Sequence, residues 1–162
     1  MTTFSSDTEI PEEPKAPPKS ARRRAREFTL QGLYQWRVGG NDGASIEAHM
    51  PEMEDFAKAD REFFVGTLRG VMAQHEKLIE QVSVHIDRPF TELSPVEACI
   101  LMLGSFEMAN HAETPYRVII NEAIELTKAF GGTDGHKYVN GVLDKVAAEV
   151  RPAEVEAKKK GR

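Results

Sequence analysis

The sequence contains a single cysteine, Cys99, among its 162 residues. One cysteine cannot form a disulfide within the chain, and it cannot supply a thiolate metal site by itself. Because Cys99 lies in the most apolar stretch, we expect an inert, buried thiol. No apolar run approaches the ~18 residues that a membrane span needs, and the N-terminus lacks the basic start and apolar stretch of a secretory signal. These absences predict a cytoplasmic protein without membrane contact.

Sequence motifs for catalysis and cofactor binding are missing as well. There is no G-x-x-x-x-G-K-[ST] phosphate loop and no G-x-G-x-x-G turn. Five histidines are present, but no two of them lie three or four residues apart, as a metal pair on one helix requires. His75 falls on an apolar stripe, where a hydrogen-bonded core histidine is typical. We therefore expect a protein that is not an enzyme and that holds no cofactor and no metal.

Positive charge is concentrated in one short block. The net charge is −5, and it divides into −2 for residues 1–19, +4 for residues 20–37 and −7 for residues 38–162. Within the middle segment, four arginines stand close together: Arg22, Arg23, Arg24 and Arg26. The overall charge argues against a general nucleic-acid coat protein, whereas the local block predicts an anion-binding patch.

Helical periodicity runs through the chain from residue 20 to residue 152, and no convincing alternating strand occurs. Ser20 is the predicted N-cap of a helix that ends near Val38, before Gly39-Gly40. Helices are then predicted over about 45–57, with a break near Pro51, and over about 60–86. "SPVE" at 94–97 is a capping box, and "TPYR" at 114–117 begins the next helix with Thr114 as N-cap. The last helix is predicted from Asp134 to just before Pro152.

The two ends of the chain have a different composition from the middle. Four prolines, Pro11, Pro14, Pro17 and Pro18, predict a disordered tail over residues 1–19. Residues 153–162 predict a frayed or disordered basic tail. Residues 20–152 predict an all-α bundle of about six helices. The segment "VEACILMLGSFEMAN" is apolar almost all round and is therefore predicted to occupy the centre of the bundle.

The residues alone leave two interpretations of the arginine block open. A helix N-terminus already carries partial positive charge, so four arginines there do not favour the helix. They form either a solvated patch, paired with the chain's own acids, or a phosphate site in which guanidinium and exposed N–H groups act together. On a helical wheel, Tyr34 lies outside the packed side of this helix. An exposed ring at that position suits stacking against RNA bases.

A second candidate site is the segment "GGTDGHKYVNGVLDK", residues 131–145. It combines three glycines at a helix start with Asp134, Lys137 and Tyr138. An ordinary turn between helices, capped by Asp134, explains the same residues and is the interpretation that the segment favours when it is taken alone.

Three stretches stand out when they are taken together: "ARRRAREFTLQGLYQW", "INEAIELTKAFG" and "HKYVNGVLDK". The first resembles the opening helix, and the other two resemble the C-terminal signature, of the NusB family of bacterial transcription antitermination factors. The resemblance covers about residues 20–152. It implies an all-α fold of six to seven helices in two closely packed subdomains.

The resemblance also implies a function. A protein of this family pairs with NusE, which doubles as a small-subunit ribosomal protein, and the pair binds the single-stranded boxA segment of nascent RNA. With other Nus factors, it modifies RNA polymerase so that the enzyme reads through terminators, notably in ribosomal RNA operons.

Residue by residue, the resemblance and the pattern give a set of expected RNA-binding residues: Arg22, Arg23, Arg24, Arg26, Tyr34, Lys137 and Tyr138. Glu107 and Asp134 are expected on the binding surface, where they would meet the basic partner. Two alternatives remain. One is a protein-interaction bundle whose partner supplies most of the RNA affinity. The other is a stand-alone relative of the RNA-binding domain of an rRNA cytosine methyltransferase, although such an enzyme needs a Gly-rich cofactor loop and catalytic cysteines.

Overall fold

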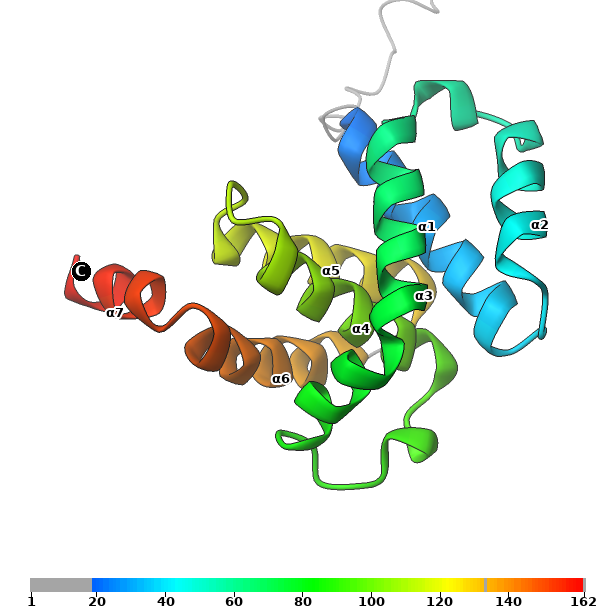
Figure 1. Ribbon diagram of the computed structural model, residues 1–162. Helices are drawn as coiled ribbons and strands as arrows, with labels where there is room; N and C mark the ends of the chain where they lie inside the picture. The colour runs from blue at the N-terminus through cyan, green and yellow to red at the C-terminus, as the bar shows by residue number, and fades with distance from the viewer. Residues whose placement is uncertain (1–18, 133, 162) are drawn as a thin grey trace, which may run out of the picture.

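The computed structural model describes residues 19–132 and 134–161, and this part of the chain contains helices and no strand (Figure 1). Its α-helices are α1 (Ala21–Arg37), α2 (Gly43–His49), α3 (Arg61–Ser83), α4 (Pro95–Asn110), α5 (Tyr116–Phe130), α6 (Gly135–Val150) and α7 (Pro152–Lys160). Short 3-10 turns occur at η2 (Met50–Glu52), η3 (Phe56–Lys58) and η4 (Phe90–Glu92). The predicted all-α fold is confirmed.

Side-chain oxygens cap two of the long helices where the sequence predicts it. The Ser20 hydroxyl accepts a hydrogen bond from the backbone N–H of Arg23 at 3.0 Å, at the start of α1. The Ser94 hydroxyl accepts one from the backbone N–H of Glu97 at 3.1 Å, at the start of α4. Each cap satisfies one of the N–H groups that a helix leaves free in its first turn. Both helix starts are therefore fixed by local sequence.

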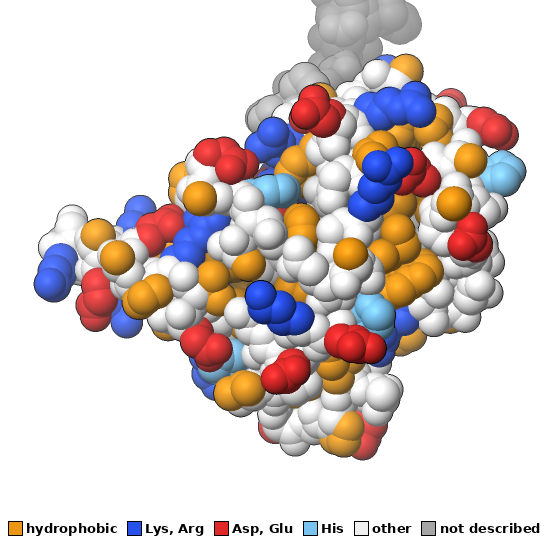
Figure 2. Space-filling model, viewed as in Figure 1, with side chains coloured by type: hydrophobic (Ala, Val, Ile, Leu, Met, Phe, Trp, Pro, Cys, Tyr) orange, Lys and Arg blue, Asp and Glu red, His pale blue; other side chains and the backbone are white. Residues whose placement is uncertain are grey.

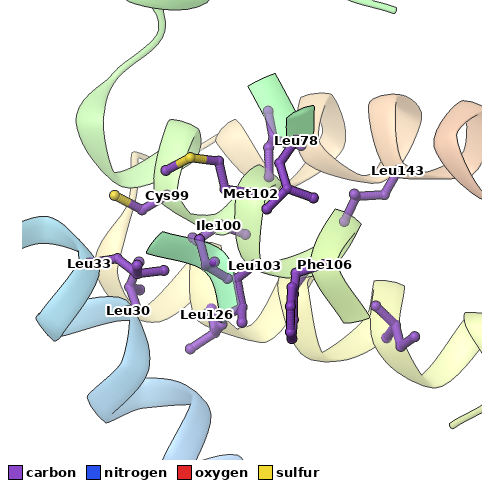
Figure 3. Packing of buried hydrophobic residues seen from close by; sticks show 14 of the residues in the cluster. Leu30, Leu33, Leu78, Cys99, Ile100, Met102, Leu103, Phe106, Leu126 and Leu143 are labelled. Atoms are coloured by element: carbon purple, nitrogen blue, oxygen red, sulfur yellow. The ribbon is translucent and has the colours of Figure 1, made fainter. Parts of the chain in front are cut away.

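α4 forms the centre of the bundle and contacts α1, α3, α5 and α6. All of its side chains from Ala98 to Met108 are buried. Figure 3 shows leucines from the four surrounding helices around it: Leu33 of α1, Leu78 of α3, Leu126 of α5 and Leu143 of α6. A helix that is apolar on all sides must be covered on all sides. The predicted central position of this segment is confirmed.

The helices form two groups that share one core. α1, α2 and α3 contact one another, and so do α4, α5 and α6, with α7 packed on the end of α6. α1 and α3 also pack against α4, so that the buried side chains form one continuous cluster. In Figure 1, α2 lies on the outer side of α1, and α7 projects at the opposite end of the molecule. This arrangement agrees with two closely packed subdomains.

The C-terminal segment is a helix, which corrects the expectation of a frayed tail over residues 153–162. α7 buries one apolar side chain, Val155, and ends in three lysines. Arg151, just before it, donates hydrogen bonds to the carbonyl oxygens of Met108 at 3.0 Å and His111 at 2.7 Å. These carbonyls lie at the C-terminal end of α4, where helical partners run out. The guanidinium therefore fixes the beginning of α7 on α4.

α7 also supplies the cap that α5 lacks. Thr114 does not cap α5, contrary to the prediction, and no side chain does so from the expected position. The Glu154 carboxylate of α7 instead accepts a hydrogen bond from the backbone N–H of Tyr116 at 2.8 Å. The start of α5 is thus set by a contact between residues 38 positions apart.

The other differences from the predicted elements are small. The segment predicted as one broken helix over 45–57 consists of α2, η2 with Pro51, and η3. The helix predicted to reach residue 86 ends at Ser83. The predicted disordered tail lies outside the described residues, apart from Lys19. Within the described ranges, no helix is both long enough and apolar enough to cross a membrane.

Candidate nucleic-acid interface

The arginine block forms the first turns of α1, and its side chains point in different directions. The first turn contains no acidic residue, so nothing in it offsets the positive end of the helix dipole. Because successive residues are turned by about 100° around a helix axis, neighbouring arginines cannot share one face. Arg22 lies over Phe63 of α3, Arg23 reaches Glu122 of α5, Arg24 is half-buried, and Arg26 points into the core.

Arg26 is buried, which corrects the expectation that it faces RNA. Its side chain is 4% exposed, and its Nε and Nη2 donate to the two carboxylate oxygens of Glu107 at 2.9 and 2.7 Å. Glu107 is itself 2% exposed, so its expected place on the binding surface is wrong too. The reason is helix geometry, since Arg26 shares a face with Leu30 and Leu33, which pack against α4. The pair joins α1 to α4 inside the molecule.

The charge state of Glu107 follows from this contact. Burial raises the pKa of the carboxyl, but the hydrogen bonds and positive charges around it outweigh burial and lower the pKa below its ordinary value. Arg26 supplies the two short bonds, and His111 Nδ1 stands 3.7 Å from the carboxylate. Glu107 is therefore ionised at neutral pH and stays paired with Arg26.

Arg23 remains at the surface but is bonded to α5. Its Nε and Nη2 donate to the carboxylate oxygens of Glu122 at 3.0 and 2.7 Å. This hydrogen bond is the main cause that raises the pKa of Arg23 above its ordinary value. The Arg23 side chain is still 38% exposed. The guanidinium thus combines a fixed position with access to solvent.

Arg22 and Arg24 are held less firmly. The Arg22 guanidinium lies 4.8 Å from the centre of the Phe63 ring and 3.8 Å from a carboxylate oxygen of Asp60. Such an exposed, long contact with an acid stabilises little. Arg24 forms no ion pair with any described residue. Within the described part of the chain, neither side chain is held by a short ion pair, so each can meet an external anion at little cost.

Tyr34 lies further along α1 and is 41% exposed, in agreement with its position on the helical wheel. It lines a pocket of about 300 Å³ with Phe130, which ends α5 and is 40% exposed, and with Gln31, Gln35 and Val96. Two exposed aromatic rings beside amide side chains can receive a flat, polar-edged group such as a nucleobase. Sequence reasoning missed Phe130, because its spacing of four from the buried Leu126 is typical of a core position.

Lys137 and Tyr138 lie in the first turns of α6. Tyr138 contacts two residues of the segment that follows α3, Asp87 and Arg88. Arg88 stacks over the Tyr138 ring, with its guanidinium carbon 5.1 Å from the ring centre. The Tyr138 hydroxyl donates to Asp87 at 3.4 Å. Lys137, Tyr138 and Lys145 line a pocket of about 310 Å³. Apart from their place at a helix end, nothing in the sequence pattern indicates a role for Asp87 or Arg88.

Asp134 precedes α6 and is exposed, and its side chain does not cap the helix as the turn interpretation predicts. The start of α6 lies against the start of α4. The contact is so close that a Cβ atom added at Gly135 would lie 2.7 Å from a Glu97 carboxylate oxygen. Val96, the neighbour of Glu97, lines the Tyr34 pocket. The first turn of α4 therefore connects the exposed side of α1 with the first turn of α6.

The exposed side of α1 can be defined by its residues as the α1 strip: Arg23, Arg24, Glu27, Gln31, Tyr34 and Gln35. All of them are at least partly exposed. Over the part from Arg23 to Tyr34 the strip extends about 16 Å, at 1.5 Å per residue. On the face drawn in Figure 2, acidic and basic side chains are interspersed over the surface and form no single basic patch. Within the α1 strip, Arg23 and Arg24 are the basic residues and Glu27 is acidic, so its positive charge is confined to its N-terminal end.

The structure gives Cys99 and His75, the other residues considered for catalysis or metal binding, structural positions. Burial raises the pKa of the Cys99 thiol to about 11, so it is not a thiolate at neutral pH. His75 lies with its Nδ1 2.8 Å from the carbonyl oxygen of Met72 and its ring 5.1 Å from that of Trp36, edge to face. Among the described residues, no three His, Cys, Asp or Glu side chains are grouped as metal ligands.

The family model and two related proteins that match this chain carry the name NusB. The model of the NusB family matches residues 23–148. The chain is 84% identical over all of its 162 residues to the Transcription antitermination protein NusB of Dechloromonas aromatica (strain RCB), of which it covers 99%. It is 53% identical over 149 residues to the protein of the same name from Ralstonia nicotianae, covering 92% of this chain and 96% of the relative.

Solved structures of the same fold agree. T. maritima NusB matches with a TM-score of 0.72 and 26% identity, over 88% of this chain and 99% of that chain. A structure of the antitermination factors NusB and NusE in complex with dsRNA matches with a TM-score of 0.73 and 21% identity, over 80% of this chain and 97% of that chain. Taken with the family match and the 84% identical relative, these results establish that the chain belongs to the NusB family of transcription antitermination proteins.

Proposed function

We propose that this chain is a non-enzymatic, cytoplasmic antitermination factor that binds boxA-type RNA together with NusE. One observation carries the RNA-binding part: the α1 strip bears Arg23 and Arg24 at one end and Tyr34 at the other. Arginines at a helix N-terminus suit phosphates, and an exposed ring suits an unstacked base. Phosphate contacts fix the register of the RNA, and base contacts supply its specificity.

The comparisons support the process and the partners. The relatives bear the name of transcription antitermination proteins, and a solved structure of the same fold is that of NusB and NusE with dsRNA. We carry NusE and RNA over to this chain on that basis. The RNA of that structure is double-stranded, whereas the exposed rings of Tyr34 and Phe130 favour unpaired bases. Other Nus factors and RNA polymerase would join indirectly, through the RNA and NusE.

Each candidate residue then has a part. Arg22, Arg23 and Arg24 bind phosphates, and Tyr34 with Phe130 receives a base. Lys137 and Tyr138 extend the site past the first turn of α4, where the second pocket lies. Arg26 and Glu107, being buried, act by holding α1 on α4. Asp134 stays available at the surface for the basic partner protein.

A second arrangement, in which the chain mainly binds a protein that carries most of the RNA affinity, is favoured by a different pocket. This pocket, of about 280 Å³, lies between α1, α3 and the turn after α4. Its lining includes the acids Asp60, Glu62 and Glu113 together with Phe63, whose ring already lies 4.8 Å from the Arg22 guanidinium carbon. The three acids outnumber Arg22, so the pocket suits a basic group of a partner protein that would displace or join that side chain. Both arrangements can operate together in a complex of three components.

The RNA site is tested by removing one arginine from the N-terminal end of the α1 strip. Arg24→Ala takes away an arginine that forms no ion pair with the described part of the chain, and Arg69→Ala, the matched control, removes an exposed arginine of α3 that is bonded to Glu47. We expect Arg24→Ala to weaken binding of a fluorescent boxA-type RNA and to reduce the slope of log K against log[salt] by about 0.7. Arg69→Ala should change neither. Equal effects of the two variants, measured by anisotropy with and without NusE, would contradict the proposed site.

A further inference from the structure

An acidic side chain lies inside the proposed RNA site, and its geometry indicates what it does. Glu122 of α5 accepts hydrogen bonds from Arg23 Nε at 3.0 Å and Nη2 at 2.7 Å. A guanidinium has five N–H donors on a planar fork, and this contact uses one edge of it. No described residue bonds Nη1 of Arg23. The Nη1 edge of a 38% exposed side chain is therefore left for another oxyanion.

Glu122 is held in turn by the core. One of its carboxylate oxygens lies 3.6 Å from Arg26 Nη1, while the Nε and Nη2 of Arg26 are bonded to Glu107. Four side chains thus alternate in charge from the interior to the surface, in the order Glu107, Arg26, Glu122 and Arg23. We call this row the ion ladder. It crosses from α4 through α1 to α5 and back to α1, so the outermost guanidinium is positioned by packed helices.

Two roles for such an acid can be distinguished. Glu122 could compete with phosphate for Arg23, in which case it weakens RNA binding. Alternatively, it orients Arg23, so that the side chain loses less freedom when it binds phosphate. The bidentate geometry favours orientation, because the bond to Glu122 leaves a second edge of the fork open. The contact of Glu122 with Arg26 also favours orientation. A competing carboxylate would have to move away from Arg23 when phosphate binds, whereas Arg26 holds Glu122 in place.

We propose that Glu122 is a positioning residue for RNA binding, which holds Arg23 with its Nη1 edge toward a phosphate group. The proposal rests on the proposed function, because it requires RNA at Arg23. It predicts that removing the negative charge of Glu122 lowers the affinity for RNA. Removing a negative charge beside a polyanion raises affinity by simple electrostatics, whereas removing a positioning residue lowers it.

Glu125 provides the matched control. It lies on α5 near Glu122, contributes to the negative charge around Arg23, and is exposed. It lies 3.9 Å from Lys128, and it accepts no hydrogen bond from Arg23. Glu122→Gln and Glu125→Gln remove the same charge from the same helix. Only the first removes the bidentate support of Arg23.

The experiment measures anisotropy of a fluorescent, single-stranded boxA-type RNA with the full chain. We expect Glu122→Gln to weaken binding about 3- to 10-fold, as the loss of one ordered side chain implies, and Glu125→Gln to strengthen it slightly. In an Arg23→Ala background, Glu122→Gln should no longer weaken binding. A damaged fold would weaken it in both backgrounds, so the double variant separates positioning from a general structural role. Thermal melts of each variant accompany the titrations.

Three outcomes decide the question. Weaker binding that disappears in the Arg23→Ala background supports the positioning role. Stronger binding by Glu122→Gln, like that by Glu125→Gln, would make Glu122 a competitor of phosphate and overturn the proposal. An equal loss in both backgrounds would also overturn it. If Arg23→Ala and Arg24→Ala both leave the affinity unchanged, the RNA site itself is wrong, and the failure belongs to the proposed function.

Discussion

The Arg26 guanidinium and the Glu107 carboxylate form two hydrogen bonds, 2.9 and 2.7 Å long, in the interior between α1 and α4. Their positions in the sequence are 81 residues apart. Both side chains are almost fully buried, so each charge depends on the other for its stability. An ion pair therefore holds α1, the helix that carries the proposed RNA site, on α4 at the centre of the bundle. Its contribution to stability can be measured.

Removing one partner should destabilise the fold strongly. Arg26→Ala leaves the Glu107 charge buried without its main partner, and we expect the free energy of unfolding to fall by about 3–5 kcal/mol. The double variant Arg26→Met with Glu107→Leu removes both charges, so it should be clearly more stable than Arg26→Ala. Urea denaturation followed by circular dichroism measures both. A double variant as unstable as the single one would mean that packing, and not the unpaired charge, causes the loss.

The same pair makes stability depend on pH. The pKa of Glu107 in the folded chain is below its ordinary value of 4.5, so the unfolded chain takes up this proton first as the pH falls. The stabilisation is therefore complete above pH 4.5 and is lost as the pH falls through the folded pKa. The difference in unfolding free energy between the native chain and Glu107→Gln should be constant near neutral pH and shrink below pH 4.5. A difference that does not change down to pH 3.5 contradicts this assignment.

Arg151 should be important for stability although it lies close to the C-terminus. Its guanidinium donates to the carbonyls of Met108 and His111 at the end of α4, and Arg151→Ala leaves these partly buried acceptors without a donor. We expect a loss of about 2–3 kcal/mol. The control is Arg117→Ala, whose contact with Asp144 is exposed and worth under about 1 kcal/mol. Similar losses for the two variants in chemical denaturation would show that Arg151 does not anchor α7.

Tyr34 should contribute to RNA binding through its ring and not through its hydroxyl. Tyr34→Ala removes the stacking surface beside Phe130, and we expect a loss of about 1–3 kcal/mol in RNA affinity. Tyr34→Phe keeps the ring and should bind nearly as well as the native chain. Met53→Ala removes an equally exposed apolar side chain away from the α1 strip and serves as the control. Loss of affinity in Tyr34→Phe would assign the contact to the hydroxyl.

Local sequence signals predicted most of the fold for identifiable reasons. Ser20 and Ser94 mark helix starts because their caps involve residues only three positions away. α7 was missed because it buries one apolar side chain and is held mainly by Arg151 and Glu154, whose partners lie 37 to 44 residues earlier. No periodic pattern reports contacts of that kind.

The candidate site was predictable in part. The helical wheel correctly gives Tyr34 an exposed ring, and it also places Arg26 beside Leu30 and Leu33, a clue that the dense arginine block obscured. That Arg26 is bonded to Glu107 depends on how α1 packs on α4, which the spacing of residues along one helix cannot reveal. For the same reason the contact of Arg23 with Glu122 on α5 could be found only in the folded chain.

The claim that the N-terminal end of α1 is an RNA site is tested most directly by removing three positive charges either there or at a distant helix end. One variant replaces Arg22, Arg23 and Arg24 by alanine, and the other replaces Lys158, Lys159 and Lys160 at the end of α7. We predict that the first weakens binding of boxA-type RNA at least ~10-fold and lowers the salt slope by about 2, while the second has little effect. Equal losses of affinity in the two triple variants would contradict the account.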